Sequence, residues 1–345
     1  SEVFAAVRQA KGIAVAECDL LSLAVVSAPG DLGADVAIGS SQRFGVPMGF
    51  GGPSAGFMAV RKGLERQIPG RLVGTSVDAD GNPAYRLALQ TREQHIRRDR
   101  ATSNICTAQV LLAVMAGMYA VWHGPAGLRR IATEVHGRTV RLADALRAGG
   151  LDITTTAFFD TIRVVVAGRA GELWSRCREA GFTLDLVDDD TLGISLDETV
   201  TDDDIVTLAN LLSGTGLPSG SDCAPATGDD STASSSDSAD SGWPRSLVRT
   251  TEYLTHPVFT SFGSETAMMR YLKRLADRDF ALDRGMIPLG SCTLKLNAAM
   301  EMEAISWPQF AGLHPFVPAE DAEGTLQMID QLETWLAQLT GYDTV

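Results

Sequence analysis

The stretch SSQRFGVPMGFGGPSAGFMAV, residues 40–60, determines how the rest of this chain is interpreted. Its glycines and prolines lie between two apolar runs, ADVAIGS at 34–40 and AGFMAV at 55–60, which predict β-strands. A glycine-rich loop between strands lets the backbone approach a ligand closely, although most such loops are ordinary turns. This loop contains no lysine, so its chemistry has to be judged from the residues around it.

The residues on either side continue the pattern of an α/β domain. GIAVAEC at 12–18 and LAVVSAP at 23–29 also predict strands, and the chain is expected to turn helical over 86–122. The apolar run VLLAVMAGMYAVW at 110–122 falls short of the roughly 20 residues that cross a bilayer. We therefore expect a fully buried helix there and no membrane span.

A smaller α+β subdomain is expected next. Helical spacing of apolar residues over 127–150 is followed by a strand at 161–168, a helix at 171–181, a strand at 191–197 and a helix at 201–214. Thr201 is a candidate N-cap for the last helix, and the aspartates after it suit the helix dipole. Alternation of these elements fits an α+β arrangement.

Residues 213–242 have the composition of a linker or a disordered insertion, since they are rich in Ser, Asp and Gly and contain no aromatic or basic residue. After them, residues 264–279 predict an amphipathic helix with Ser264 as its cap. A last helix is predicted near the C-terminus, with Gly341 as its stop and an apolar stripe of Leu326, Ile329, Leu332, Leu336 and Leu339.

Composition narrows the class of protein. The 43 acidic and 29 basic residues give a net charge of −14, which argues against nucleic acid or an anionic membrane as a partner and favours a small molecule or a protein. Five scattered cysteines show no metal-site or disulfide spacing, so we expect a reducing, cytoplasmic setting and no metal. The chain has no signal-peptide pattern, and we expect it to be a fragment at both ends.

Residues 91–106 form the first candidate site. Arg92, His95 and Asp99 recur at helical spacing and would share one face if the segment is helical. With Arg97 and Arg98 they gather positive charge, which suits a carboxylate or a phosphate, but a solvated basic face explains them equally well. Asn104 and Cys106 follow directly, and Cys106 is more simply an inert core thiol.

Residues 289–297 form the second candidate site. Ser291, Cys292 and Thr293 offer donors to a phosphate or a substrate, although they would also cap a turn. Lys295 and Asn297 lie beside them, among small and hydroxylic residues that leave room for a bound group. The other lysines, Lys11, Lys62 and Lys273, are better explained as solvated charges.

Four motifs in order carry a resemblance: GADVAIGSSQRFGVPMGFGGPSAGF, QTREQHIRRDRATSNICTAQVLLA, MYAVWHGPAGLRRIA and MIPLGSCTLKLNAAMEMEAISWPQFAGLHPF. Together they resemble glycine dehydrogenase (decarboxylating), the P-protein of the glycine cleavage system. The resemblance implies the type I pyridoxal-phosphate (PLP) enzyme, or aspartate aminotransferase-like, fold. It also implies two homologous halves, of which only the second carries PLP.

On that basis residues 1–127 are expected to be the end of the large domain of the cofactor-free half, 128–212 its small subdomain, 213–242 a linker, and 243–345 the start of the PLP-binding half. Gln42 would occupy the position of the second half's Schiff-base lysine, and glutamine cannot form an imine. The resemblance therefore implies that the lysine holding PLP is not among these residues and that this chain alone is inactive. Residues 91–106 would line the site entrance, and 289–297 the cofactor.

The implied activity is decarboxylation of glycine with transfer of the aminomethyl group to the lipoyl arm of H-protein. Partners would be lipoylated H-protein and the other glycine cleavage components, in a homodimer or a two-subunit assembly. An alternative is a cofactor-free scaffold half that supports a separate catalytic PLP subunit.

Overall fold

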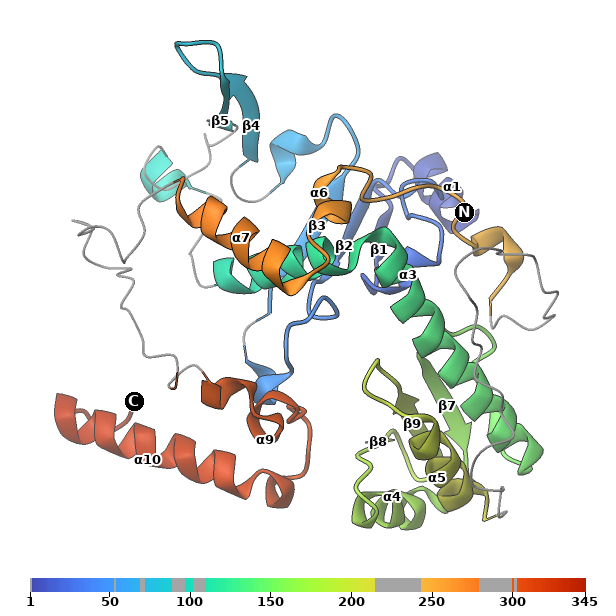
Figure 1. Ribbon diagram of the computed structural model, residues 1–345. Coiled ribbons are helices and arrows are strands. Elements are labelled where there is room, and N and C mark those ends of the chain that lie inside the picture. The colour runs from blue at the N-terminus through green and yellow to red at the C-terminus, as the bar shows by residue number, and fades with distance from the viewer. Residues whose placement is uncertain are drawn as a thin grey trace. The chain divides into compact units, whose positions relative to one another are not determined.

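A computed structural model describes residues 2–52, 54–68, 72–88, 97–101, 109–214, 243–278, 300 and 303–345 (Figure 1). These residues divide into two compact units. The first unit comprises residues 1–20, 28–123 and 256–345, and the second comprises 21–27 and 124–255. The predicted boundaries of the two enzyme halves are not tested by this division and stay a prediction.

The first unit contains a three-stranded sheet of β1 (Val15–Glu17), β2 (Val36–Ser40) and β3 (Gly56–Val60), in that order, preceded by helix α1 (Glu2–Gln9). β1 runs parallel to β2, whereas β3 runs antiparallel to it. Gly39 allows this packing, because a Cβ there would lie 2.3 Å from the carbonyl oxygen of Cys18. These three strands are the ones predicted over 12–18, 34–40 and 55–60.

A strand predicted at 23–29 is wrong. Residues Ser22–Ala24 form the short 3-10 helix η1, and Val26 makes an isolated antiparallel bridge with Val248. An apolar run as short as LAVV fits several conformations, and its periodicity alone does not separate a strand from a helical turn.

The hairpin of β4 (Leu72–Val77) and β5 (Pro83–Ala88) was not predicted. Its turn is built on Asp78, whose carboxylate accepts hydrogen bonds from the backbone N–H groups of Asp80 and Asn82. The helical prediction from residue 86 is therefore wrong for 86–88. Further along the chain the short 3-10 helix η4 (Arg98–Arg100) precedes the long helix.

Helix α3 (Val110–Ala148) belongs to both units and is broken at Gly124, where φ is 60° and ψ is −178°. Pro125 follows the break and lacks the N–H that a continuous helix would use. The helix ends before Gly149, as predicted, and Gly150 adopts a left-handed φ of 83°.

The part of α3 before the break is less buried than predicted. Ala116, Ala120 and Val121 are buried, but Val110, Leu111, Val114 and Trp122 are exposed, because apolar residues occur all round the helix and the described residues cover only one side. By length and composition alone α3 is a candidate membrane span, with 28% of its most apolar window buried. The break leaves only about 14 residues, or about 21 Å, of continuous helix before Gly124, less than a bilayer requires.

The second unit is a four-stranded antiparallel sheet in the order β6 (Asp152–Ile153), β7 (Thr161–Val165), β9 (Thr191–Ser195), β8 (Asp185–Leu186). It packs with helices α4 (Ala170–Glu179) and α5 (Asp202–Ser213) and with the later part of α3. Fully buried side chains of its core include Leu142, Leu146, Ile162, Val164, Leu173, Leu192, Ile194 and Leu212. The predicted α+β arrangement is confirmed, although two-residue strands β6 and β8 were not predicted.

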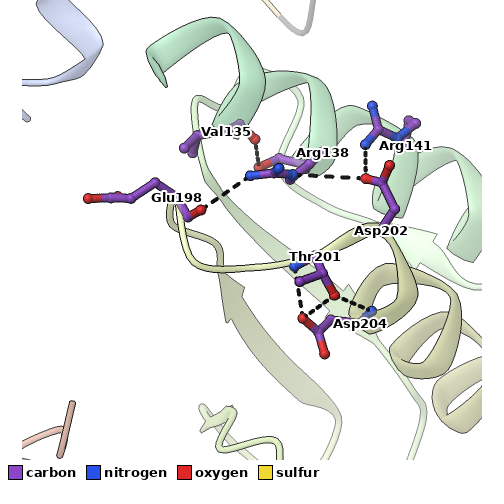
Figure 2. Close-up of polar contacts among 8 residues, drawn as sticks. Val135, Arg138, Arg141, Glu198, Thr201, Asp202 and Asp204 are labelled. Atoms are coloured by element: carbon purple, nitrogen blue, oxygen red, sulfur yellow. Dashed lines mark hydrogen bonds and ion pairs between the residues drawn. The ribbon is translucent and has the colours of Figure 1, made fainter. Parts of the chain in front are cut away.

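Helices α3 and α5 are joined by charged contacts (Figure 2). Asp202, at the first turn of α5, accepts from Arg141 at 2.5 Å and lies 3.9 Å from Arg138. Arg138 also donates to the carbonyl oxygen of Glu198 at 3.4 Å. Thr201 caps α5, and its side chain and that of Asp204 form a reciprocal capping box, as the sequence predicted for the cap.

Ser213, predicted as the first residue of the linker, is the last residue of α5, and Gly214 is its left-handed C-cap. Residues 215–242 lie outside the described residues. After them η5 (Arg245–Leu247) belongs to the second unit.

The later segments of the first unit contain α6 (Val258–Ser261), α7 (Glu265–Ala276), η6 (Ala304–Ser306), α9 (Pro308–Ala311), η7 (Ala319–Asp321) and α10 (Glu323–Thr340). Ser264 caps α7, and Gly341 ends α10 with a φ of 76°, both as predicted. The predicted apolar stripe of α10 is exposed among the described residues.

Candidate functional site: the glycine-rich loop between β2 and β3

The loop of residues 41–55 is closed at its base by Ser41. The Ser41 backbone N–H and its Oγ both donate to the carbonyl oxygen of Ala55, at 2.8 and 2.7 Å. Ser41 is buried, so these bonds are shielded from water. We name this pair of bonds the clasp, and it holds both ends of the loop at the edge where β2 ends and β3 begins.

Inside the clasp, glycines let the loop approach its neighbours. Gly45 has a φ of 76°, and a Cβ there would lie 2.6 Å from the ring of Tyr119 on α3. The Tyr119 ring stacks on Phe44, with ring centroids 5.7 Å apart. Near the tip, the Phe50 N–H donates to the carbonyl oxygen of Leu313 at 2.8 Å, with Phe50 itself at a φ of 53°.

Gln42 is half-buried and held by its backbone. Its N–H donates to Ser40 Oγ at 3.1 Å, and its carbonyl oxygen accepts from Val46 N–H at 3.0 Å. Next to it Arg43 forms an ion pair with Asp19 at 3.7 Å, and both side chains are mostly buried. The loop thus carries an amide and a paired guanidinium at these two positions, and it contains no primary amine.

The lysines among the described residues lie outside the 41–55 loop. Lys62 is exposed after β3, and Lys273 is paired with Asp277 on the surface of α7. Lys11 lines an open depression of about 530 Å³ together with Arg8, Gly12, Asp35 and Arg61. The loop from 41 to 55 does not fit covalent attachment of PLP, because an imine needs a primary amine and none is present.

The carboxylate of Asp35 is buried and held by several partners. It is 3% exposed and accepts from the backbone N–H of Ala14 at 2.9 Å and from Arg61 Nε at 2.5 Å, with Arg8 3.7 Å away. The Ala14 hydrogen bond, then the bond and charge of Arg61, hold the pKa of Asp35 below its usual value. Sequence reasoning missed this residue, since an aspartate just before a strand carries no distinctive pattern.

Most of the predicted site residues lie outside the described residues. This applies to Arg92, His95, Asn104 and Cys106 of the first candidate site and to Ser291, Cys292, Thr293, Lys295 and Asn297 of the second. Arg97 and Arg98 are described and exposed. Arg98 has a φ of 52°, so no regular α-helix passes through it to carry Asp99 on a common face with Arg92 and His95.

Two histidines that each precede a proline, His256 and His314, make turn hydrogen bonds. His256 Nδ1 accepts from the N–H of Val258 at 3.2 Å, and His314 Nδ1 accepts from the N–H of Phe316 at 3.1 Å. Among the described residues no cluster of three or more His, Cys, Asp or Glu side chains is placed to hold a metal ion.

Comparison with known proteins agrees with this architecture. The family model of the glycine cleavage system P-protein matches residues 1–212. A glycine dehydrogenase (decarboxylating) of Cutibacterium acnes is 65% identical over all 345 residues, and one of Cereibacter sphaeroides is 55% identical over 342 residues. The chain covers 100% and 99% of its own length in these matches but only 33% and 34% of theirs, so it spans about a third of the relatives' length.

A solved structure shows the same fold. The crystal structure of an inhibitor-bound glycine decarboxylase (P-protein) of the glycine cleavage system matches with a TM-score of 0.53 and 35% identity, over 61% of this chain and 49% of that one. The predicted fold class is confirmed by this match. The chain belongs to the glycine cleavage system P-protein family.

Proposed function

We propose that the complete protein containing this chain is a PLP-dependent glycine dehydrogenase (decarboxylating) that releases CO2 from glycine and transfers the aminomethyl group to the lipoyl arm of an H-protein. The observation that supports it is the 65% identity along the whole chain to a glycine dehydrogenase (decarboxylating). That match includes the loop and both candidate site segments, because it covers 100% of this chain.

PLP, when bound, supplies an electron sink for the carbanion left when a carboxylate departs. Because the 41–55 loop lacks an amine, we propose that it belongs to a half that does not hold the cofactor. Ser291, Cys292, Thr293, Lys295 and Asn297 remain our candidates for cofactor contacts. Our candidates for the site entrance are Arg92, His95, Arg97, Arg98, Asn104 and Cys106. The guanidinium groups of the arginines and the imidazole of the histidine suit a carboxylate.

The alternative, in which this chain is a scaffold for a separate PLP subunit, is not favoured. In both relatives the sequences that precede and follow residues 213–242 lie in one polypeptide about three times as long as this chain. We propose the same arrangement here, with glycine, lipoylated H-protein and the other cleavage components as partners, in a homodimer or a two-subunit assembly. Free Cys18 and Cys177 suit the proposed reducing, cytoplasmic setting.

The activity is tested on the full-length protein. Carboxyl-labelled glycine is incubated with the protein, PLP and lipoylated H-protein, and labelled CO2 is collected. Release that requires both PLP and the lipoyl group supports the proposal. Release that is the same with unlipoylated H-protein, or no release from a folded, PLP-loaded protein, contradicts it.

The absence of an amine in the loop is tested on the 345-residue chain. We expect no cofactor absorbance band that survives dialysis and no adduct after borohydride reduction, as judged by mass spectrometry. One stoichiometric adduct, for instance on Lys295, would show that the cofactor chemistry lies within this chain. The chain with Gln42→Lys is the matched comparison, because it restores an amine at the loop position.

A further inference from the structure

Residues 243–253 pair with a segment that lies more than 200 positions earlier in the sequence. Val248 bridges Val26 in antiparallel register. On either side of that bridge Ser27 N–H donates to the carbonyl oxygen of Leu247, and Arg249 N–H donates to that of Val25, both at 2.7 Å. All of these residues belong to the second unit.

Side chains add to the backbone pairing. Arg249 Nη1 donates to the carbonyl oxygen of Leu23 at 2.8 Å, and its guanidinium lies over the ring of Tyr253, 4.7 Å from the ring centroid. The Tyr253 hydroxyl donates to the carbonyl oxygen of Pro125 at 2.7 Å. Ser27 Oγ donates to the carbonyl oxygen of Val248 at 3.2 Å.

An aromatic contact marks the beginning of this segment. The ring of Trp243 stacks on that of His136 on α3, with centroids 3.8 Å apart and planes 29° apart. His136 is buried, and its Nδ1 donates to the carbonyl oxygen of Phe159 at 2.8 Å, which fixes the orientation of the imidazole ring. Trp243 is the first described residue after the Ser- and Asp-rich stretch.

We propose that residues 243–253, which we name the strap, are a docking segment that fixes where the sequence after 215–242 begins on the second unit. The surface that receives it consists of the 21–27 backbone, the Pro125 carbonyl group and the His136 ring. Covalent connection by itself supplies only an effective concentration, on the order of millimolar for a short flexible linker. The contacts of the strap add a defined position and direction for the sequence that follows residues 215–242.

Two consequences distinguish this device from a simple tether. Cutting or shortening the 215–242 stretch leaves the strap in place, because the contacts of the strap all lie within the second unit. Removing the strap's anchors releases it even though the chain is intact. Arg249 is the central anchor, since it bonds to Leu23 and covers Tyr253 while its own N–H pairs with Val25.

The direct test is hydrogen exchange by mass spectrometry on the full-length protein with a protease site inserted after Ala226. We expect peptides covering 21–27 and 245–253 to keep at least tenfold slower exchange than the unfolded chain, before and after cleavage. Exchange at the unfolded rate after cleavage would overturn the proposal. The outcome does not depend on catalysis, so it is independent of the proposed function.

Variants identify the anchors. Arg249→Ala is expected to raise exchange at least tenfold in both peptides while peptides from β9 stay unchanged. Arg270→Ala, an exposed arginine on α7, is the matched control and changes neither. Tyr253→Phe removes only one hydroxyl group and gives a smaller rise, so it tests the strap even if Arg249→Ala does not fold. Unchanged exchange in a folded Arg249→Ala or Tyr253→Phe protein would contradict the assigned anchors.

A second arm rests on the proposed function and measures glycine decarboxylation. Deletion of residues 223–234 leaves about 16 residues, which extend to roughly 50 Å at about 3.3 Å per residue. We expect kcat/KM to change less than twofold on deletion and to fall at least fivefold in Arg249→Ala. A larger fall in kcat/KM on deletion than in Arg249→Ala would show that decarboxylation depends on the length of the 215–242 stretch and not on the strap. An inactive parent protein would refute the proposed function and leave the exchange result standing.

Discussion

At residue 42 the side chain is a primary amide, and its neighbour Arg43 is already paired with Asp19. The absence of an amine was predictable from the sequence, because only four lysines exist and none lies in the loop. The clasp and the packing of Tyr119 against the loop were not predictable, because they depend on residues from distant parts of the chain. Most of the predicted site residues lie outside the described residues and stay predictions.

Gly45 is expected to tolerate no side chain. Gly45→Ala places a Cβ at a left-handed φ and 2.6 Å from Tyr119, so we expect a loss of about 1–3 kcal/mol in the free energy of unfolding. The control is Gly171→Ala in α4, where a Cβ meets open space, and a gain of up to about 1 kcal/mol is expected. Urea unfolding measures both, and equal effects would contradict the assigned role of Gly45.

Asp35 is expected to make stability depend on acid pH. Its folded pKa is lowered, so its stabilising contribution is present above its unfolded pKa of about 4 and is lost as pH falls through the folded value. Asp35→Asn should therefore lower the urea midpoint clearly at pH 7 and much less near pH 3. Asp330→Asn on α10, whose carboxylate has no such contacts among the described residues, should leave the midpoint unchanged. A gap of equal size at both pH values for Asp35→Asn would contradict this account.

Cys177 is expected to be unreactive in the folded protein. It is fully buried in the second unit, and burial raises the pKa of its thiol to about 11. A rise of about two pKa units leaves roughly 100-fold less thiolate at pH 8, and thiolate is the form that alkylates. Timed iodoacetamide labelling with mass spectrometry should show slow modification at Cys177 in the native chain and fast modification in urea.

Elements with a clear period and a capping residue were predicted well. Helices α5 and α7 have caps at Thr201 and Ser264, and α10 ends at Gly341, all visible in the sequence. Strands β6 and β8 have two residues each, too few to show an alternating pattern. The apolar run at 23–29 predicted a strand because it is β-rich, but the sequence reveals neither the helical turn at Ser22–Ala24 nor the single bridge from Val26 to Val248.

The cap of α5 is testable as an element. Thr201→Ala removes the acceptor for the Asp204 N–H and breaks the capping box, so we expect a loss of about 1 kcal/mol in the free energy of unfolding. Thr207→Ala, exposed in the middle of the same helix, should be neutral or slightly stabilising, since alanine favours the helix. Thermal unfolding followed by circular dichroism compares them; a Thr201→Ala protein as stable as the parent would refute the cap.

The whole chain exposes apolar surface while carrying a net charge of −14. The stripe of Leu326, Ile329, Leu332, Leu336 and Leu339 on α10 and the exposed start of α3 are contiguous apolar surfaces of the kind that bury against a partner. Such surfaces are where association between copies of this chain is expected to begin.

Self-association of the 345-residue chain should therefore increase with salt. Repulsion between acidic chains is screened above about 0.1 M ionic strength, while apolar attraction is not weakened. We expect light scattering after size exclusion to show larger species at 0.5 M NaCl than at 0.02 M. Leu332→Lys with Leu339→Lys should reduce them, and a monodisperse monomer under all these conditions would contradict the expectation.

The clasp between Ser41 and Ala55 has a consequence for how such a protein diverges. A loop pinned at both ends keeps its path whichever side chain stands at position 42, so a reactive residue can be lost without loss of the fold. The path of the loop thus depends on Ser41 and the carbonyl oxygen of Ala55, whereas any chemistry at position 42 depends on the side chain there. A substitution at position 42 is therefore expected to leave the two hydrogen bonds between Ser41 and Ala55 in place.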